Sequence, residues 1–558
     1  MTPRAEDASS EVPVGTVVLV VVTLAAAAAA VPAFVVWLFV GESPNATIVE
    51  LVRGSGRLVA DGAWKDPASA FPRRVAQQMP DATGWWGGAL WLVAITAAGL
   101  LAASRRLEPL AASNRLGRRA YDLRGRRPRA WARPRDVPSL VVRRRVPERF
   151  TLGILDGRVL AADREAHVAV VAPTRSGKTT RCVIPWLLEH RGPAIVTSTK
   201  TDVLASTAAY RGRHGKVLVW NPFGPESVGW TPLERCDDWS CALQRAQWLA
   251  DAIQEGESEV ARYWRGEAAK LLAPLLHAAA LMRTGIDTVV DWLDRQEITD
   301  PQRVLRAKEA HAASRQLKAV AALDDRNRGT TYMSAASLLA AYRFPEVAAT
   351  ARAELTADAL LDGTANTLYI VASERHQRLL TPLVVSILSD VLHHAAERSN
   401  AGSALHPTLR VLIDEAANIA PLRDLPGHLS QAAGHGVRFA TVWQSIAQMR
   451  TRYRDAADSI LANSTAKLFM GPVTDETTQR YLTSLLGDEL VTTTSRTRRA
   501  GGGRTSITAS ATTRPKASAA ALQQLRPDRA LVVEGAHPPA VVGLRPFWHE
   551  WPAERRRL

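Results

Sequence analysis

Cysteine is scarce in this chain of 558 residues. The three cysteines, Cys182, Cys236 and Cys241, show no metal-ligand spacing and are too few for a disulfide framework. The sequence therefore argues against a zinc site and a disulfide-rich scaffold, and it favours a reducing cytoplasm for the soluble bulk. Acidic residues are also outnumbered, with 54 Asp and Glu against 70 Lys and Arg, which gives a formal net charge of +16. This excess favours nucleic acid or anionic lipid as a partner.

Two long segments near the N-terminus lack charged residues. Residues 14–40 and 84–103 are each long enough to cross a bilayer as a helix, and the first is too long for the apolar core of a signal peptide. Arginines gather after the second segment, so the positive-inside rule places that side in the cytoplasm. We therefore expect a multi-pass protein of the cell (plasma or inner) membrane with both termini inside. The expected parts are a cytoplasmic N-terminus (1–13), two transmembrane helices (14–40 and 84–103), an external loop (41–83) and a basic linker (104–149).

The arginines of the basic linker have two interpretations. They could bind nucleic acid, or they could fix the membrane topology and attract anionic lipid. We favour the second interpretation. Several prolines in the same stretch indicate a linker between the membrane and the remainder of the chain.

Residues 167–180 read HVAVVAPTRSGKTT, an apolar run followed by small residues, Lys178 and two threonines. This predicts the strand, phosphate loop and helix start of a P-loop NTPase, although Ala172 replaces the first glycine of G-x-x-x-x-G-K-[ST]. Lys178 would neutralise charge between the β- and γ-phosphates, and the Thr179 hydroxyl would take one Mg²⁺ position. The expected nucleotide-binding residues are Ala172, Pro173, Thr174, Arg175, Ser176, Gly177, Lys178, Thr179 and Thr180.

Two further apolar runs end in polar residues. Residues 408–422 read TLRVLIDEAANIAPL, so Asp414 and Glu415 follow an expected strand in the Walker B arrangement. An acidic pair after a strand is also common at helix N-caps, but the phosphate loop in the same chain favours the catalytic interpretation. Asp414 would then hold Mg²⁺ through water, and Glu415 would act as general base. Gln444 ends another apolar run (437–449), where its amide can hydrogen-bond the γ-phosphate as a sensor.

Strands and helices alternate from residue 150 onward, which predicts a mostly parallel α/β sheet with nucleotide at the carboxyl ends of its strands. The pattern turns helical over 235–355, so we expect an all-α insertion between two parts of the nucleotide-binding domain, 150–234 and 356–558. Pro274 lies inside one helical pattern and suggests a kink or a split. Near the end, 490–515 predicts two short strands around a mobile tip, and a closing strand pair follows.

Two apolar spans, the phosphate loop, the helical insertion, DEAANIAP and the strand ending in Gln444 occur in one chain. Together with LGILDGR, TKTDVL, NPFGPESVGWTPLE, YWRGEAAKLLAPLL and ILANSTAKLFMGPVTDETTQRYLTSLLGDE, they cover nearly the whole sequence. This set resembles the coupling proteins of type IV secretion and conjugation, the TraG/TraD-type ATPases.

That resemblance implies a RecA-like P-loop NTPase domain with an inserted all-α domain, preceded by two transmembrane helices. It implies a hexameric motor that uses ATP and Mg²⁺ to pass DNA, or a relaxase–DNA complex, to a type IV secretion channel. Lys178 and Thr179 would bind nucleotide and metal, Asp414 and Glu415 would form the Walker B pair, and Gln444 would be the sensor. The insertion would select the substrate protein or contact accessory proteins.

One departure from the family pattern concerns arginine. Many relatives carry, just before the sensor strand, an arginine that completes the neighbouring subunit's site, but here that position is Ala433. Strand alternation would let Arg438 face a subunit boundary while Val437 and Phe439 pack inward, so we expect Arg438 to act in trans. It could also be an ordinary strand-end residue. The other candidates are Arg175, Arg452 and Arg454.

Two other functions remain open at this point. A chromosomal DNA translocase of the FtsK/SpoIIIE type would bring more membrane spans, a long linker and a C-terminal DNA-reading domain. A membrane receptor or scaffold with an impaired ATPase is favoured weakly by Ala433 and opposed by the intact nucleotide motifs. DNA-stimulated ATP hydrolysis would separate the motor from the receptor.

Overall fold

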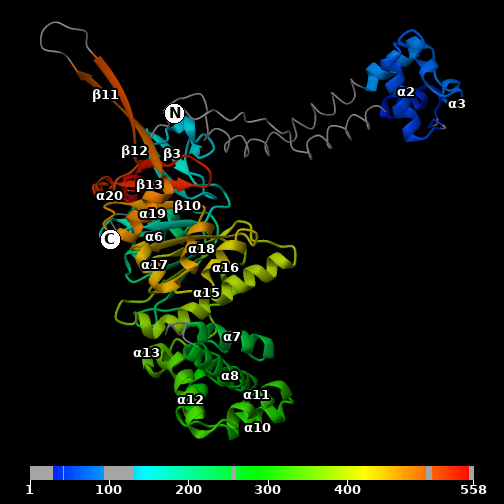
Figure 1. Ribbon diagram of the computed structural model, residues 1–558. Coiled ribbons are helices and arrows are strands. Elements are labelled where there is room, and N and C mark those ends of the chain that lie inside the picture. Colours follow the sequence, from blue (N-terminus) through cyan, green and yellow to red (C-terminus); the bar gives the residue numbers. More distant parts are fainter. Residues whose placement is uncertain are drawn as a thin grey trace, which may run out of the picture. The chain divides into compact units, whose positions relative to one another are not determined.

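The computed structural model describes residues 29–41, 43–44, 46–92, 131–252, 259–497 and 506–551 (Figure 1). The chain forms two compact units, Met1–Asp122 and Leu123–Leu558. The expected parts 1–13 and 104–130 lie outside the described residues. The two expected transmembrane segments are described only over 29–40 and 84–92, and both of these parts are helical.

The described part of the first unit is helical. Its elements are the apolar helix Ala29–Val40, α2 (Ile48–Ala60), the 3₁₀ turn η1 (Pro67–Ala70), α3 (Arg73–Ala76) and a final helix over 82–92. Thr47 and Glu50 form a capping box that begins α2, since each side chain bonds the backbone of the other. Val35, Leu51 and Trp85 belong to one small buried cluster. The segment expected as an external loop (41–83) therefore contains ordered helices.

A mixed sheet of twelve strands forms the centre of the second unit. Its central strands are parallel, as the alternation of strands and helices predicted, and its outer strands on one side are antiparallel. In spatial order the strands are β1 (Val141–Val142), β3 (Arg158–Ala161), β2 (Thr151–Leu155), β14 (Ala540–Gly543), β13 (Arg529–Glu534), β10 (Ala466–Met470), β4 (Val168–Val171), β9 (Val437–Trp443), β8 (Leu409–Ile413), β5 (Ala194–Ser198), β7 (Thr367–Val371) and β6 (Val217–Trp220).

Both faces of the parallel region are covered by helices, which explains why its strands are nearly continuous apolar runs. Successive residues belong to different cores: Ile195 packs on one side of the sheet and Val196 on the other. One core contains α5 (Ile184–Glu189) and α6 (Asp202–Arg211). The other contains α15 (Gln377–Asn400), α16 (Leu425–Gln431), α17 (Ile446–Tyr453), α18 (Ala456–Asn463) and α19 (Glu476–Leu486).

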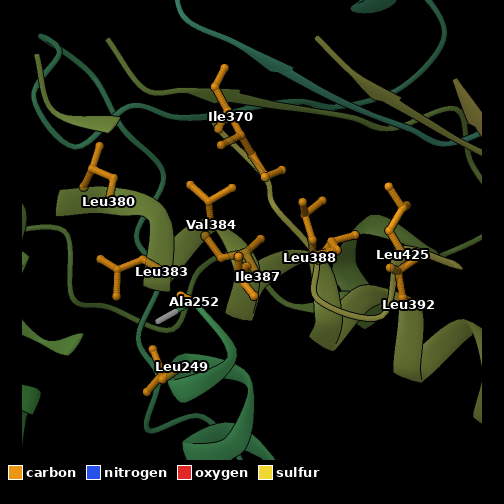
Figure 2. Close-up of a cluster of buried hydrophobic side chains, with 14 of the residues drawn as sticks. Leu249, Ala252, Ile370, Leu380, Leu383, Val384, Ile387, Leu388, Leu392 and Leu425 are labelled. Carbon is orange, nitrogen blue, oxygen red and sulfur yellow. The ribbon is translucent and has the colours of Figure 1, made fainter. Parts of the chain in front are cut away.

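Helix α15 is the one described helix long and apolar enough to cross a membrane, but 72% of its most apolar window is buried inside the protein. It is a core helix of the second unit. Figure 2 shows its leucines between the sheet residue Ile370 and the helical residue Leu249.

Every described element between β6 and β7 is a helix or a 3₁₀ turn, and these elements gather at one end of the second unit (Figure 1). They are α7 (Trp239–Asp251), α8 (Glu259–Met282), α9 (Ile286–Asp294), α10 (Thr299–Ala307), α11 (His311–Ala321), α12 (Asp325–Leu338), η4 (Ala340–Arg343), α13 (Pro345–Ala348) and α14 (Ala357–Leu360). Helix α8 continues through Pro274, so the expected split into two helices is wrong. Helix α7 packs against both α8 and α15.

Two ten-residue strands, β11 (Asp488–Thr497) and β12 (Ser506–Pro515), form a separate antiparallel ribbon. The ribbon projects from the rest of the second unit (Figure 1). It is longer than the short strands expected over 490–515, and its connection, 498–505, lies outside the described residues. The short helix α20 (Ala519–Gln523) leads into β13 and β14, the antiparallel closing pair that the sequence predicts.

Candidate nucleotide site

The phosphate loop connects β4 to a helix that begins at Lys178. Residues Thr179–Val183 form a π-helical turn that continues into α5. Gly177 has a φ of 78°, a conformation that glycine adopts without strain. A Cβ there would lie 2.3 Å from Arg181 Nη1, so that flexible side chain would have to move. Arg175 also has a positive φ, 62°, which is uncommon for a residue with a side chain. Such backbone strain concentrates at ligand-binding loops.

Ala172 begins the loop without strain. It keeps a negative φ and is fully buried, so a side chain larger than hydrogen is tolerated at this position. Its N–H donates to the carbonyl oxygen of Trp443 at 2.9 Å. This bond ties the carboxyl end of β4 to the carboxyl end of β9, one residue before Gln444.

The parallel register brings the loop and the acidic pair together, because β8 and β4 both flank β9 and end at the same edge of the sheet. Lys178 Nζ lies 2.6 Å from Glu415 Oε1. The Thr179 hydroxyl donates to Asp414 Oδ2 at 2.8 Å. The residues expected to hold nucleotide and metal come from two segments that are distant in sequence. These contacts show that they touch each other in the fold.

Asp414 is the most buried of the charged residues in this cluster, with 5% of its surface exposed. Burial raises the pKa of its carboxyl group to about 6, against the opposing effects of the Thr179 hydrogen bond and the Lys178 charge. Asp202, at the start of α6, adds a smaller upward contribution to the same pKa. Asp414 is thus a carboxylate whose negative charge this site leaves partly uncompensated.

Gln444 joins the cluster through Glu415. Its side-chain amide donates to Glu415 Oε2 at 2.9 Å, while Lys178 contacts the other carboxylate oxygen. Glu415 has a φ of 57°, so its backbone is held in the left-handed region just after β8. The amide of Gln444 and the ammonium of Lys178 therefore fix both oxygens of the expected general base.

Two buried oxygen atoms of the cluster have no hydrogen-bond partner among the described residues. They are Ser176 Oγ in the phosphate loop and Asp414 Oδ1. Unpaired buried polar atoms are costly, and they are typical of sites that bind a ligand or ion. A phosphate-bound Mg²⁺ fits this set, because Mg²⁺ commonly takes one or two protein oxygens and completes its shell with water and phosphate. Thr179 and Asp414 are the residues placed to supply them.

Arg438 does not join the cluster, and here the expectation from strand alternation is wrong. All seven residues of β9 are buried, so neither side of the strand faces a boundary. The Arg438 guanidinium donates to the carbonyl oxygens of Arg164, Ala433 and Val437 at 2.7, 2.8 and 3.1 Å. These contacts lie at the amino end of β9, opposite the end that carries Gln444. Arg438 is a buried structural residue in this fold.

Two residues that the sequence reading missed support the site. The Thr197 hydroxyl, on β5, donates to the backbone carbonyl of Asp414 at 3.3 Å. Arg181 folds back over the phosphate loop and donates to the carbonyl oxygen of Ser176 at 2.9 Å. The position of Arg181 directly after GKTT could have indicated a contact with the phosphate loop. Nothing in the sequence near Thr197 indicated its contact with Asp414 across the sheet.

A family model and several curated proteins match this chain. A family model described as type IV secretory system conjugative DNA transfer matches residues 133–552. Two curated Escherichia coli proteins named conjugal transfer protein TraG are each 27% identical, over 312 and 354 residues, covering 51% and 57% of this chain and 49% and 56% of theirs. Protein VirD4 of Agrobacterium fabrum is 24% identical over 353 residues, which is 60% of this chain and 51% of that protein. The chain spans about half the length of these relatives.

Solved structures share the fold. The bacterial conjugative coupling protein TrwBdeltaN70 has a TM-score of 0.59 at 17% identity, covering 75% of this chain and 94% of that chain. The plasmid coupling protein TrwB in complex with ADP and Mg²⁺ has a TM-score of 0.53 at 17% identity, covering 68% and 85%. At this level of identity the likeness concerns the arrangement of the α/β sheet and its helices.

Proposed function

The chain belongs to the type IV secretory system conjugative DNA transfer family, and on this basis we propose that it is a membrane-anchored, ATP-driven motor. Its substrate would be DNA, alone or bound by a relaxase, and its destination a type IV secretion channel. One observation carries the catalytic part of the proposal. At the carboxyl ends of the parallel strands, contacts join Lys178, Thr179, Asp414, Glu415 and Gln444.

The contacts support a proposed task for each residue. Lys178 would exchange Glu415 for phosphate oxygens, and this exchange would free the Glu415 carboxylate to accept a proton from the attacking water. Thr179 and Asp414 would hold Mg²⁺, which supplies charge neutralisation when bound. Gln444, bonded to Glu415 Oε2, would keep the base oriented and connect it to β9. Bulk water has little access to this pair, since the Lys178 and Glu415 side chains are only 11% and 17% exposed.

The experiment uses the full chain in detergent and measures ATP hydrolysis without DNA, with single-stranded DNA and with double-stranded DNA. We expect Mg²⁺-dependent turnover that DNA stimulates, and we expect Glu415→Gln to remove it. ATP binding without turnover under all three conditions would contradict the motor and support a receptor with an impaired ATPase.

The remaining parts of the proposal concern organisation. We propose membrane anchorage through 14–40 and 84–103, a homo-hexamer, and substrate selection by the helical insertion, 235–355, between 150–234 and 356–558. Relaxase or another substrate protein, channel components and membrane lipid would be the partners. A topology reporter fused after residue 60 should be active only outside the cytoplasm, and one fused after residue 120 only inside. The opposite pattern would contradict use of cytoplasmic ATP.

A further inference from the structure

A groove of about 830 Å³ lies at the outer edge of the large sheet, far from the nucleotide site in strand order. It is formed by β1, by the start of β3 and by the 3₁₀ turn η2 (Pro134–Asp136) that precedes β1. Four exposed arginines line it: Arg133, Arg135, Arg143 and Arg158. Asp156 is the one carboxylate among its lining residues, so the groove is strongly positive.

Two of these arginines flank the paired residues of β1 and β3. The strands are antiparallel, with Val142 opposite Val159, and the register continued by one residue beyond the end of β1 would bring Arg143 opposite Arg158. Like charges in opposed positions destabilise a strand pair. The turn that leads into Arg158 is a two-residue hairpin. Asp156 and Gly157 both have the positive φ that such a turn requires, 45° and 80°.

Little inside the protein compensates this charge. Among the described residues, Arg133, Arg143 and Arg158 form no ion pair with a carboxylate, and Arg135 only approaches Asp136, at 3.9 Å. The loop residue Asp156 is itself exposed. Uncompensated guanidinium groups around one concavity are suited to a phosphate, because each can donate two parallel hydrogen bonds to phosphate oxygens.

We propose that this groove binds the phosphate-bearing headgroup of an anionic membrane phospholipid. The apolar lining, Val141, Val142, Val159, Pro134 and Pro138, lies among the arginines and suits the boundary between headgroup and acyl chain. Only residues 104–132 separate the groove from the apolar segment 84–103, so the proposed anchor would hold the groove at high effective lipid concentration. This last step rests on the membrane anchorage proposed above.

Nucleic acid is the less suitable occupant. Sites for single-stranded nucleic acid combine positive charge with aromatic side chains on which bases stack, and no aromatic residue occurs among the residues that line this groove. The volume is within the range of small-ligand pockets, about 300–1,000 Å³. A single lipid headgroup matches such a pocket better than a polymer does.

The test measures binding of dihexanoylphosphatidylglycerol to the full chain in dodecyl maltoside, with dihexanoylphosphatidylcholine as the zwitterionic comparison. We expect Arg143→Gln/Arg158→Gln to weaken binding of the anionic lipid about tenfold or more, while the zwitterionic lipid is unaffected. The matched control is Arg306→Gln/Arg315→Gln, which removes the same charge from exposed positions of the helical region and should leave binding unchanged. Arg143→Lys/Arg158→Lys keeps the charge but loses the paired donors, so its affinity should lie between those of the wild type and the glutamine variant.

Equal anionic-lipid binding by the groove variant and the wild type would overturn the proposal. So would inorganic phosphate or a 20-nucleotide DNA that displaces the lipid at matched phosphate concentration. For the wild type alone, raising the salt concentration should weaken lipid binding, and a salt-independent affinity would count against the arginines. ATP hydrolysis in detergent is measured in parallel. It should be unchanged in Arg143→Gln/Arg158→Gln, so failure of the lipid proposal is distinguishable from failure of the motor proposal.

Discussion

Lys178 Nζ lies 2.6 Å from Glu415 Oε1, so the phosphate-loop lysine and the expected general base neutralise each other across the carboxyl edge of the sheet. The two residues come from segments that are 237 positions apart in sequence. Phosphate oxygens would compete with Glu415 for the N–H donors of this ammonium group. The pair therefore links nucleotide binding to release of the base, and it predicts different consequences for the loss of each partner.

Lys178→Ala should remove ATP hydrolysis, by roughly 100-fold or more, because it removes charge stabilisation of the transferred phosphate. It should also lower stability slightly, by about 1 kcal/mol, since Glu415 loses its cation but keeps the Gln444 hydrogen bond. Turnover and thermal unfolding measure the two effects. Lys318→Ala, an exposed lysine on α11, is the control and should change neither. Wild-type turnover by Lys178→Ala would contradict its assigned role.

Glu415→Gln should leave nucleotide bound but unhydrolysed, with turnover reduced by about 10²–10⁴-fold, the usual contribution of a general base. The glutamine can still accept the hydrogen bond from Gln444, so the local structure should persist. Gln444→Ala should lower turnover less, because the base remains but one of its oxygens is no longer held. Nucleotide affinity and single-turnover hydrolysis, measured together, separate the two variants. A loss of affinity in Glu415→Gln that matches the loss of turnover would contradict a role in the chemical step.

The raised pKa of Asp414 predicts an unusual dependence of protein stability on pH. Its pKa in the folded protein, about 6, lies above the ordinary value of 3.8, so the folded state holds this proton more tightly than the unfolded state does. The contribution of Asp414 to stability is therefore most favourable below pH 4 and declines as the pH rises through 6. Asp414→Asn removes this decline and should raise the unfolding temperature at pH 8, with little change at pH 4.

The same group gives a functional test. Mg²⁺ needs the ionised carboxylate, so Mg²⁺-dependent turnover should fall as the pH drops below about 6, and Asp414→Asn should lose turnover at every pH. Thermal unfolding at several pH values and a pH–rate profile check both statements. If Asp414→Asn is less stable than the wild type at pH 8, burial of an undercompensated charge is the wrong description of this site.

The nucleotide cluster could be predicted from the sequence because its residues stand at strand ends. Parallel strands place their carboxyl ends at one edge, so the positions of Lys178, Asp414 and Gln444 after apolar runs already implied proximity. Contacts that depend on packing between distant segments could not be read in the same way. Thr197 reaches the Asp414 carbonyl from another strand, and α8 passes through Pro274 because its packing against α7, α11 and α12 outweighs the local penalty.

The junction between the helical region and the sheet contains a buried ion pair. Arg245 on α7 contacts Asp390 on α15 at 3.0 Å, and its guanidinium lies over the rings of Trp230 and Trp248 at cation–π distance. Arg245→Ala would leave Asp390 without its cation next to Glu234, whose pKa burial and Asp390 already raise to about 7. We expect a loss of about 3–5 kcal/mol, as for other broken buried pairs.

Denaturant unfolding measures this loss, and Arg245→Met/Asp390→Leu should recover much of it by removing both charges. An Arg245→Ala variant as stable as the wild type would show that the pair is not what joins the two regions.

Packing between α7 and α15 also decides how the helical region should be tested. Leu249 and Ala252 pack with Leu383 of α15 (Figure 2), so removing α7 together with the other helices would expose the apolar face of a core helix. Substitutions at the surface of α9 to α12 are the better test of substrate selection.

Variants of Arg438 can distinguish a structural role for this arginine from a catalytic role. Its guanidinium satisfies the carbonyl oxygens of Arg164, Ala433 and Val437, so Arg438→Ala should leave buried acceptors unpaired and cost about 2–4 kcal/mol. Turnover per folded molecule should stay near the wild-type value, because these contacts lie at the amino end of β9 and the nucleotide cluster lies at the carboxyl end.

Mixing Arg438→Ala with Lys178→Ala subunits supplies the decisive comparison. In mixed oligomers, some interfaces would combine an intact Lys178 from one subunit with an intact Arg438 from its neighbour. If Arg438 acts across the subunit boundary, activity would reappear on mixing. A structural Arg438 gives no such rescue, only the summed activity of the two preparations corrected for the unfolded fraction. Arg175 has the properties that Arg438 lacks, since it is exposed and lies in the phosphate loop itself. Arg175→Ala should therefore lower turnover without lowering the unfolding temperature, the reverse of the Arg438→Ala result.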